Sequence, residues 1–250
     1  MRLMSKPHPK DASQFEIFRL NLSAWAKERL EEDNRAYVQA FTRRLAETGG
    51  DFNLVLAETR PMLRGSRSWR KLLTALLDIE QTMDKVRRSV WFIGSTPAPS
   101  PSSISDPGAW LIYHVDSWYL HTYGLLERMQ KMMTLTCRHV VQPRSRGEPL
   151  KAALIADVSK MKGVIKGTRH AVAHGGGTVE ALEEQDLWEP YVIIGPDAWL
   201  NITSSYYGNM AGRRAKWHDL IERSAVQVIA TCEAWFGKLN AEAFKEDASS

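Results

Sequence analysis

The feature that most constrains the fold is an apolar stripe at helical spacing between residues 109 and 141. Residues three or four apart along it are apolar or small: Leu111, Val115, Trp118, Thr122, Leu125, Met129, Met132 and Met133. Such spacing puts side chains on one face of an α-helix, whereas a strand needs alternation at every second residue. The apolar surface is widened by Ile112, Tyr119, Leu120 and Tyr123. The segment predicts a central helix that other helices must surround.

The same spacing recurs elsewhere and predicts further helices over residues 11–48, 51–93, 150–173 and 210–244. Gly49-Gly50 is a stop signal for the first helix. The polar run at residues 31–34 either interrupts that helix or forms its solvated face, and the second region is expected to break near Pro61 and Gly65. Only residues 191–194 suggest a short strand. The fold class predicted is an all-α helical bundle.

Residues 94–108 are the clearest linker, because they contain four prolines and five serines. We therefore expect an N-terminal helical region at 1–94, a linker or long loop at 95–108 and a helical bundle at 109–250. A crossover within a single bundle is the alternative.

The composition is that of an ordinary globular protein and does not indicate a particular function. Hydrophobic residues at 44% and charged residues at 25% are ordinary for a globular protein, and a net charge of +4 tolerates RNA as a partner without requiring it. No segment resembles a signal peptide or a membrane span, so we expect a cytoplasmic protein that does not engage a membrane. Cys137 and Cys232 have no metal-binding spacing and are expected in the core.

The closest grouping of side chains suited to catalysis lies at the end of the helix predicted over residues 150–173. Arg169, His170 and His174 fall within six residues, directly before a glycine triplet at 175–177. At about 100° per residue, the two histidines lie opposite the helix's core stripe. That stripe contains Leu150, Leu154, Asp157, Met161, Ile165, Thr168 and Val172. The polar segment therefore points away from this helix's main packing face.

Two glycines share the histidine face. Gly163 and Gly167 precede His170 and His174 at spacings of four, three and four. A glycine inside a helix costs about 1 kcal/mol relative to alanine, so a helix that carries two of them gains something in return. Close approach of another backbone is the usual gain. We expect a second helix, from this chain or from a second copy, to dock on this face.

Arg169-x4-His174 at a helix end, after a second long helix with an acidic residue at Asp116, resembles the HEPN superfamily of α-helical bundle proteins. The resemblance covers roughly residues 109–245. It implies a metal-independent endoribonuclease, often a toxin or defence protein, in which two motifs face one cleft of a homodimer and an antitoxin is a possible partner. It also admits members that bind RNA, nucleotides or proteins without cutting.

On this resemblance His174 is the acid–base group, Arg169 holds the phosphate and His170 is auxiliary. The residue types suit that chemistry, because histidine transfers protons near neutral pH and arginine offers a fixed cation with forked donors. Asp116 is expected to be largely buried and to pair with Arg169, a histidine or a tyrosine. Glu127 is the reserve carboxylate. His114 and His121 are expected at the boundary of the apolar stripe, partly exposed.

A basic cluster is the candidate RNA-binding surface. It contains Arg64, Arg67, Arg70 and Lys71 around Trp69, with Lys166 as a separate candidate. Phosphate contacts and a stacking ring would suit RNA. A solvated charged face with Trp69 turned inward is the favoured alternative.

A metal site is the main competing hypothesis for the polar segment. His170 and His174 are four residues apart and could share an ion, completed by Asp116 or Glu127. The chain lacks the paired Glu-x-x-His motifs of di-iron bundles, and the histidines have no obvious third ligand. We therefore expect neither a metal nor another cofactor there.

Overall fold

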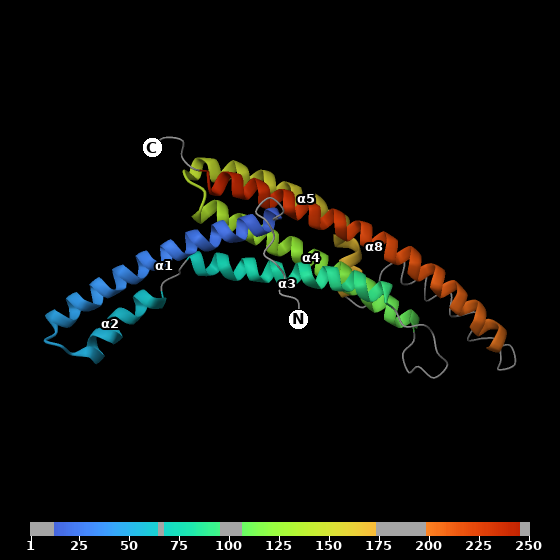
Figure 1. Cartoon of the computed structure of the whole chain (residues 1–250), viewed down its shortest axis with the longest axis horizontal. Coiled ribbons are helices and arrows are strands. Elements are labelled where there is room, and N and C mark those ends of the chain that lie inside the picture. Colours follow the sequence, from blue (N-terminus) through green and yellow to red (C-terminus); the bar gives the residue numbers. More distant parts are fainter. Residues whose placement is uncertain (1–12, 65–67, 96–106, 174–198, 246–250) are drawn as a thin grey trace, which may run out of the picture. The chain divides into compact units, whose positions relative to one another are not determined.

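The computed structural model describes residues 13–64, 68–95, 107–173 and 199–245. These residues form helices and contain no strand (Figure 1). The helices are α1 (Gln14–Glu47), α2 (Phe52–Arg64), α3 (Ser68–Gly94), α4 (Pro107–His139), α5 (Arg144–Ala173) and α8 (Trp199–Ala243). The all-α prediction is confirmed. The strand considered at residues 191–194 lies outside the described residues.

The chain divides into two compact units. The first unit contains Met1–Leu77, Lys131–Ala152 and Glu233–Ser250, and the second contains Asp78–Gln130 and Ala153–Cys232. Each unit takes segments from both sides of the Pro- and Ser-rich stretch at 95–108.

Helix α1 begins and ends on residues whose local chemistry suits those positions. The hydroxyl of Ser13 accepts a hydrogen bond from the backbone of Glu16 at 3.2 Å, which satisfies one of the free amides of the first turn. At the other end Gly49 and Gly50 have φ values of 64° and 94°. The Gly50 amide donates to the carbonyl of Leu45 at 2.9 Å. The predicted stop is confirmed, because glycine adopts a positive φ without steric cost.

The polar run at residues 31–34 does not interrupt α1, which is continuous to Glu47. Three of its four side chains are exposed, so the run is a solvated face. Helix α2 continues through Pro61 to Arg64 and α3 begins at Ser68, so the predicted break lies near Gly65 and not at Pro61.

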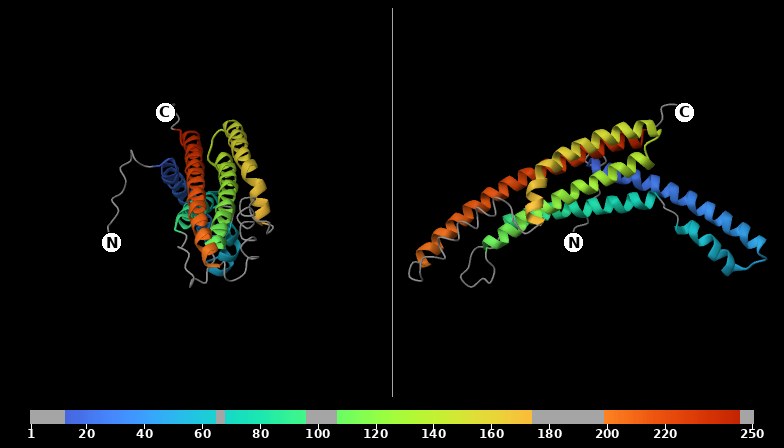
Figure 2. Two further views of the ribbon diagram at one scale, coloured as in Figure 1. Left: turned by 90° about the vertical axis from the view of Figure 1, so that its right-hand side faces the viewer. Right: turned by 180° about the vertical axis from the view of Figure 1, so that it is seen from behind.

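Aromatic contacts tie α1 to its neighbours in the first unit. Phe15 and Phe18 lie 5.0 and 5.3 Å from the ring of Phe236 on α8. Farther along α1, Phe41 meets Phe52 of α2 at 5.3 Å, where the two helices form an antiparallel pair (Figures 1 and 2). Such ring pairs in edge or tilted geometry add roughly 1 kcal/mol each to the burial of their surfaces.

The apolar stripe of α4 is buried as its spacing predicts. All eight residues of the stripe are in the core, including Leu125, Met129 and Met132 at 0% exposure. The predicted widening is wrong at Leu120, which is 39% exposed, because the buried face extends the other way around the helix, through His114 and Leu126.

The last helix is longer than its periodicity indicates, because α8 already begins at Trp199. Its predicted apolar residues are all buried: Trp217, Ile221, Val228, Cys232, Trp235 and Leu239. Cys137 is buried too, and burial raises the pKa of its thiol to about 11. Both cysteines are core residues, as predicted. Among the described helices, none combines the length and apolarity that crossing a membrane requires.

Candidate functional site

The end of α5 carries most of the predicted site. The helix continues through Lys166, Gly167, Arg169 and His170 to Ala173, but the side chains of these residues lie outside the described part of the chain. His174 and the glycine triplet lie outside it altogether. Their roles stay predictions.

The predicted core stripe of α5 is buried in part. Leu154 and Ile165 are buried, whereas Leu150, Asp157 and Met161 are partly exposed, and the buried face also includes Val158, which lies outside the stripe. Gly163, on the opposite side, is exposed, and a Cβ atom built on it would meet nothing within 4 Å. Among the described residues, none lies within 4 Å of that position, so none of them covers the glycine face there.

Lys162 of α5 contacts three side chains of α4 in the second unit. Its Nζ atom lies 3.7 Å from a carboxylate oxygen of Glu127, 3.5 Å from the amide oxygen of Gln130 and 4.9 Å from the centre of the Tyr123 ring. The two helices are consecutive and run antiparallel, and the last turns of α5 lie beside α4 (Figures 1 and 2). Helix α5, which carries the Arg169-x4-His174 segment, and α4, which carries Asp116, are therefore direct neighbours.

Asp116 is the most perturbed acid of the described residues. Its side chain is partly buried, and its Oδ1 atom is buried without a hydrogen-bond partner among them. Burial raises the pKa of the carboxyl to about 6, because the charged form loses hydration. The expected burial is thus found in part. The expected pairing is not found for Oδ1.

Glu127, the reserve carboxylate, lies at the surface. Its side chain is 52% exposed and forms the surface ion pair with Lys162. The wheel position that it shares with Asp116 points to solvent here, so Glu127 is not a buried carboxylate like the one expected at Asp116, and its reserve role stays a prediction.

The two histidines of α4 differ. His114 is 7% exposed and stacks on Phe92 of α3 at 4.8 Å, so its predicted boundary position is wrong. The aromatic neighbours at the end of α3 cover it, and burial lowers its pKa. His121 is partly exposed, as predicted. Its pKa is lowered by burial first and then by the cations of Lys85 and Arg128.

The basic cluster behaves as the favoured alternative predicts. Arg70 and Lys71 are exposed on α3, while the indole Nε1 of Trp69 donates to Asp33 of α1 at 3.0 Å. The indole ring is half-buried and its position is fixed by the hydrogen bond to Asp33, so it is not free to stack on a base. Arg67 and the side chain of Arg64 lie outside the described residues.

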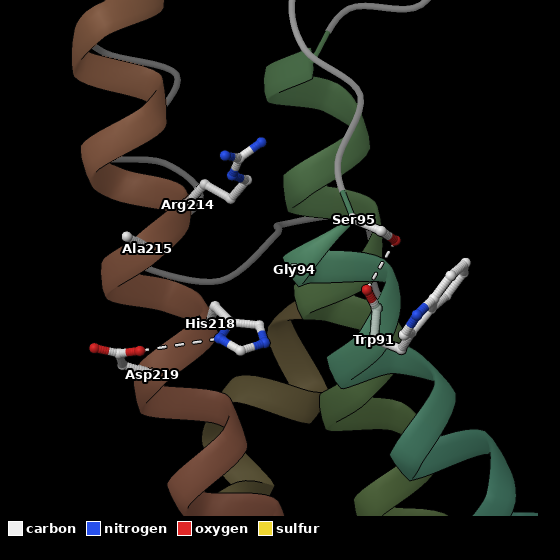
Figure 3. Close-up of a pocket in the computed structure, with 7 residues that line it drawn as sticks. All are labelled: Trp91, Gly94, Ser95, Arg214, Ala215, His218 and Asp219. Carbon is white, nitrogen blue, oxygen red and sulfur yellow. Dashed lines mark hydrogen bonds and ion pairs between the residues drawn. The ribbon is translucent and has the colours of Figure 1, made fainter.

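A pocket of about 470 Å³ lies between the end of α3 and α8, within the second unit (Figure 3). It is lined by Trp91, Gly94, Ser95, Arg214, Ala215, His218 and Asp219. The sequence reasoning missed this site. A His and a Glu four apart at 218 and 222 are present in the sequence, but nothing local indicates that α3 ends beside His218.

His218 anchors this pocket. Its Nδ1 atom lies 3.9 Å from a carboxylate oxygen of Asp219 and 3.8 Å from one of Glu222. The opposite edge of the ring faces α3, where a Cβ atom on Gly94 would lie 2.7 Å from Cδ2 and 2.8 Å from Nε2. A residue larger than glycine at position 94 would therefore clash with the His218 ring.

Comparisons with protein-family models, with curated proteins and with solved structures find no match to this chain. The end of α5, Asp116 and the pocket between α3 and α8 are therefore interpreted from their own chemistry.

Proposed function

We propose that the protein is a metal-independent endoribonuclease of the HEPN kind that acts in a cleft between two copies. The observation that carries the proposal is Asp116, a partly buried acid whose Oδ1 atom is buried and unpartnered among the described residues, on the helix that neighbours the Arg169-x4-His174 segment. Strongly perturbed carboxyls of this kind gather at functional sites more often than elsewhere.

The contact at Lys162 relates Asp116 to that segment. Tyr123 lies beside Lys162, and Asp116 and Arg169 are each seven residues, or two helical turns, away from that contact in the same direction. Seven residues span about 10 Å and return to nearly the same face. Positions 116 and 169 are therefore expected at one level of the antiparallel pair. A guanidinium at 169 would relieve the cost of the buried carboxylate and be held in place by it.

The proposed reaction uses the RNA's own 2′-hydroxyl. His174 takes the 2′ proton, the 2′ oxygen bonds to phosphorus, and the bond from phosphorus to the 5′ oxygen breaks. A protonated histidine gives its proton to the leaving 5′ oxygen, which leaves a 2′,3′-cyclic phosphate and a 5′-hydroxyl end. Arg169 stabilises the charge on the phosphate oxygens, and His170 assists.

A second copy completes the site in this proposal. The histidine positions share their face of α5 with Gly163, whose surroundings are open. A helix from another copy can approach closely there because glycine leaves a groove. Each copy would then supply one Arg-x4-His segment, so that one can act as base and the other as acid.

RNA cleavage in EDTA tests the proposal. Untagged wild type, Arg169→Ala and His174→Ala are incubated with structured and with single-stranded RNA. We expect the wild type alone to cut and each variant to lose about 10²- to 10⁴-fold in rate. Arg87→Ala and His218→Ala are matched controls of the same residue types and should cut like the wild type.

The other outcomes are equally informative. Equal cleavage by all variants would mean a contaminant or another site, and the proposal would be abandoned. RNA binding that Arg169→Ala abolishes, without any cleavage by the wild type, would instead identify a non-catalytic RNA-binding module.

A further inference from the structure

We propose that His218, Asp219 and Glu222 of α8 form a binding site for a divalent transition-metal cation, with zinc as its best occupant, at the rim of the pocket between α3 and α8. One imidazole nitrogen and two carboxylate oxygens are the ligands. This site is separate from the histidines of α5 and does not rest on the proposed ribonuclease activity.

The geometry brings three donor atoms together. One ligand atom from each residue lies within 4.8 Å of the other two. Atoms that bind one zinc ion at about 2.0 to 2.2 Å lie roughly 3 to 4 Å apart, so small side-chain rotations are enough to close the set. At 3.8 and 3.9 Å the imidazole is too far from either carboxylate for a hydrogen bond, and an ion between them would use this space.

The position of the histidine ring is fixed from the other side. The edge formed by Cδ2 and Nε2 lies against Gly94 at the end of α3, and Nδ1 faces the Asp219 carboxylate (Figure 3). The Glu222 carboxylate lies 3.8 Å from the same nitrogen. The ligand histidine therefore needs little reordering when it binds an ion. A metal-ligating histidine is commonly oriented by what its second nitrogen meets.

Charge and exposure also suit a bound cation. Two carboxylates match the two charges of the ion, and their attraction outweighs the repulsion from the single positive charge of the nearby Arg214. Asp219 and Glu222 are exposed, and His218 is about one third exposed, so water can fill the remaining positions of the ion. Imidazole as a ligand favours zinc, copper and nickel over magnesium and calcium.

Zinc titration of the untagged, metal-stripped full chain tests the site. We expect the wild type to bind one equivalent of zinc. His218→Ala and Glu222→Ala should each bind zinc at this site at least about tenfold more weakly. Gly94→Ala should weaken zinc binding as well, because the added Cβ atom displaces the ring. Magnesium should not compete. Circular dichroism and melting of each variant separate loss of the site from loss of the fold.

Two controls decide where the zinc binds. Asp84→Ala removes an exposed helix carboxylate outside the cluster and should leave binding unchanged. The double variant His170→Ala/His174→Ala should also keep the zinc equivalent, whatever its effect on RNA. Loss of zinc in that double variant with retention in His218→Ala would overturn the proposal, and so would no zinc binding by the wild type.

Discussion

At the residue scale, Asp116 makes a prediction about stability and pH. Its pKa rises to about 6 in the folded chain, against about 3.9 in an unfolded one. Between about pH 4 and pH 6 the folded state holds more protons, so the free energy of unfolding should fall as the pH rises through this window. The loss should be roughly 1 to 2 kcal/mol once the partial exposure of the side chain is allowed for.

Asp116→Asn isolates this effect, because it keeps the shape of the side chain and removes its charge. While burial without a cationic partner sets its pKa, the variant should match the wild type near pH 4 and be more stable near pH 7 in denaturant unfolding; pairing with Arg169 in the assembled site would reverse the difference at pH 7. Histidines with lowered pKa values, such as His114, act in the opposite direction but shift both proteins equally. A variant less stable than the wild type at pH 7 would show that Asp116 is already paired with a cation in the free chain.

At the element scale, two glycines of α5 should respond oppositely to alanine. A Cβ atom on Gly147 would lie 2.5 Å from the backbone oxygen of Cys137 at the end of α4, so the two helices approach closely there. Gly147→Ala should cost about 1 to 3 kcal/mol, because backbone must move. Gly163 is exposed with open space around it, so Gly163→Ala should raise stability by about 0.5 to 1 kcal/mol.

Urea unfolding of both variants at one low protein concentration measures this contrast. Gly163→Ala also controls for general effects of alanine in α5. Equal stability of Gly147→Ala and the wild type would mean that the α4–α5 connection adapts without strain, against the close approach described.

At the scale of the whole molecule, the open glycine face predicts self-association. The ribonuclease proposal requires two copies to meet through the side of α5 that carries Gly163. Gly163→Arg puts a long charged side chain on that face and should convert a dimer to a monomer, with RNA cleavage lost in parallel. Sedimentation equilibrium at several concentrations measures the change.

The matched control is Ala57→Arg, at an exposed position of α2. It should leave both the association state and the cleavage rate of the wild type unchanged. A wild type that stays monomeric at the concentrations where it cuts RNA would exclude a composite cleft.

Sequence by itself determined that the chain is helical and identified most of the buried residues of α4 and α8. Periodicity is local: the burial of Val115 or Trp217 follows from neighbours three and four residues away, and Gly49-Gly50 ends α1 through its own backbone preferences. The pattern failed at the two edges of the apolar stripe of α4, because spacing alone does not say on which side of the stripe another helix packs. Leu120 is exposed and His114 is buried for that reason.

Only the tertiary structure decided which polar groups are brought together and which are left without partners. The unpartnered oxygen of Asp116 depends on what packs around α4, and the place of His218 depends on Gly94, a residue far away in the chain. Such encounters have no local signal, because they arise from the packing of whole helices. The Arg169-x4-His174 segment could be identified from the sequence alone. The cluster at His218, Asp219 and Glu222 became a candidate site only when the structure placed the end of α3 beside His218.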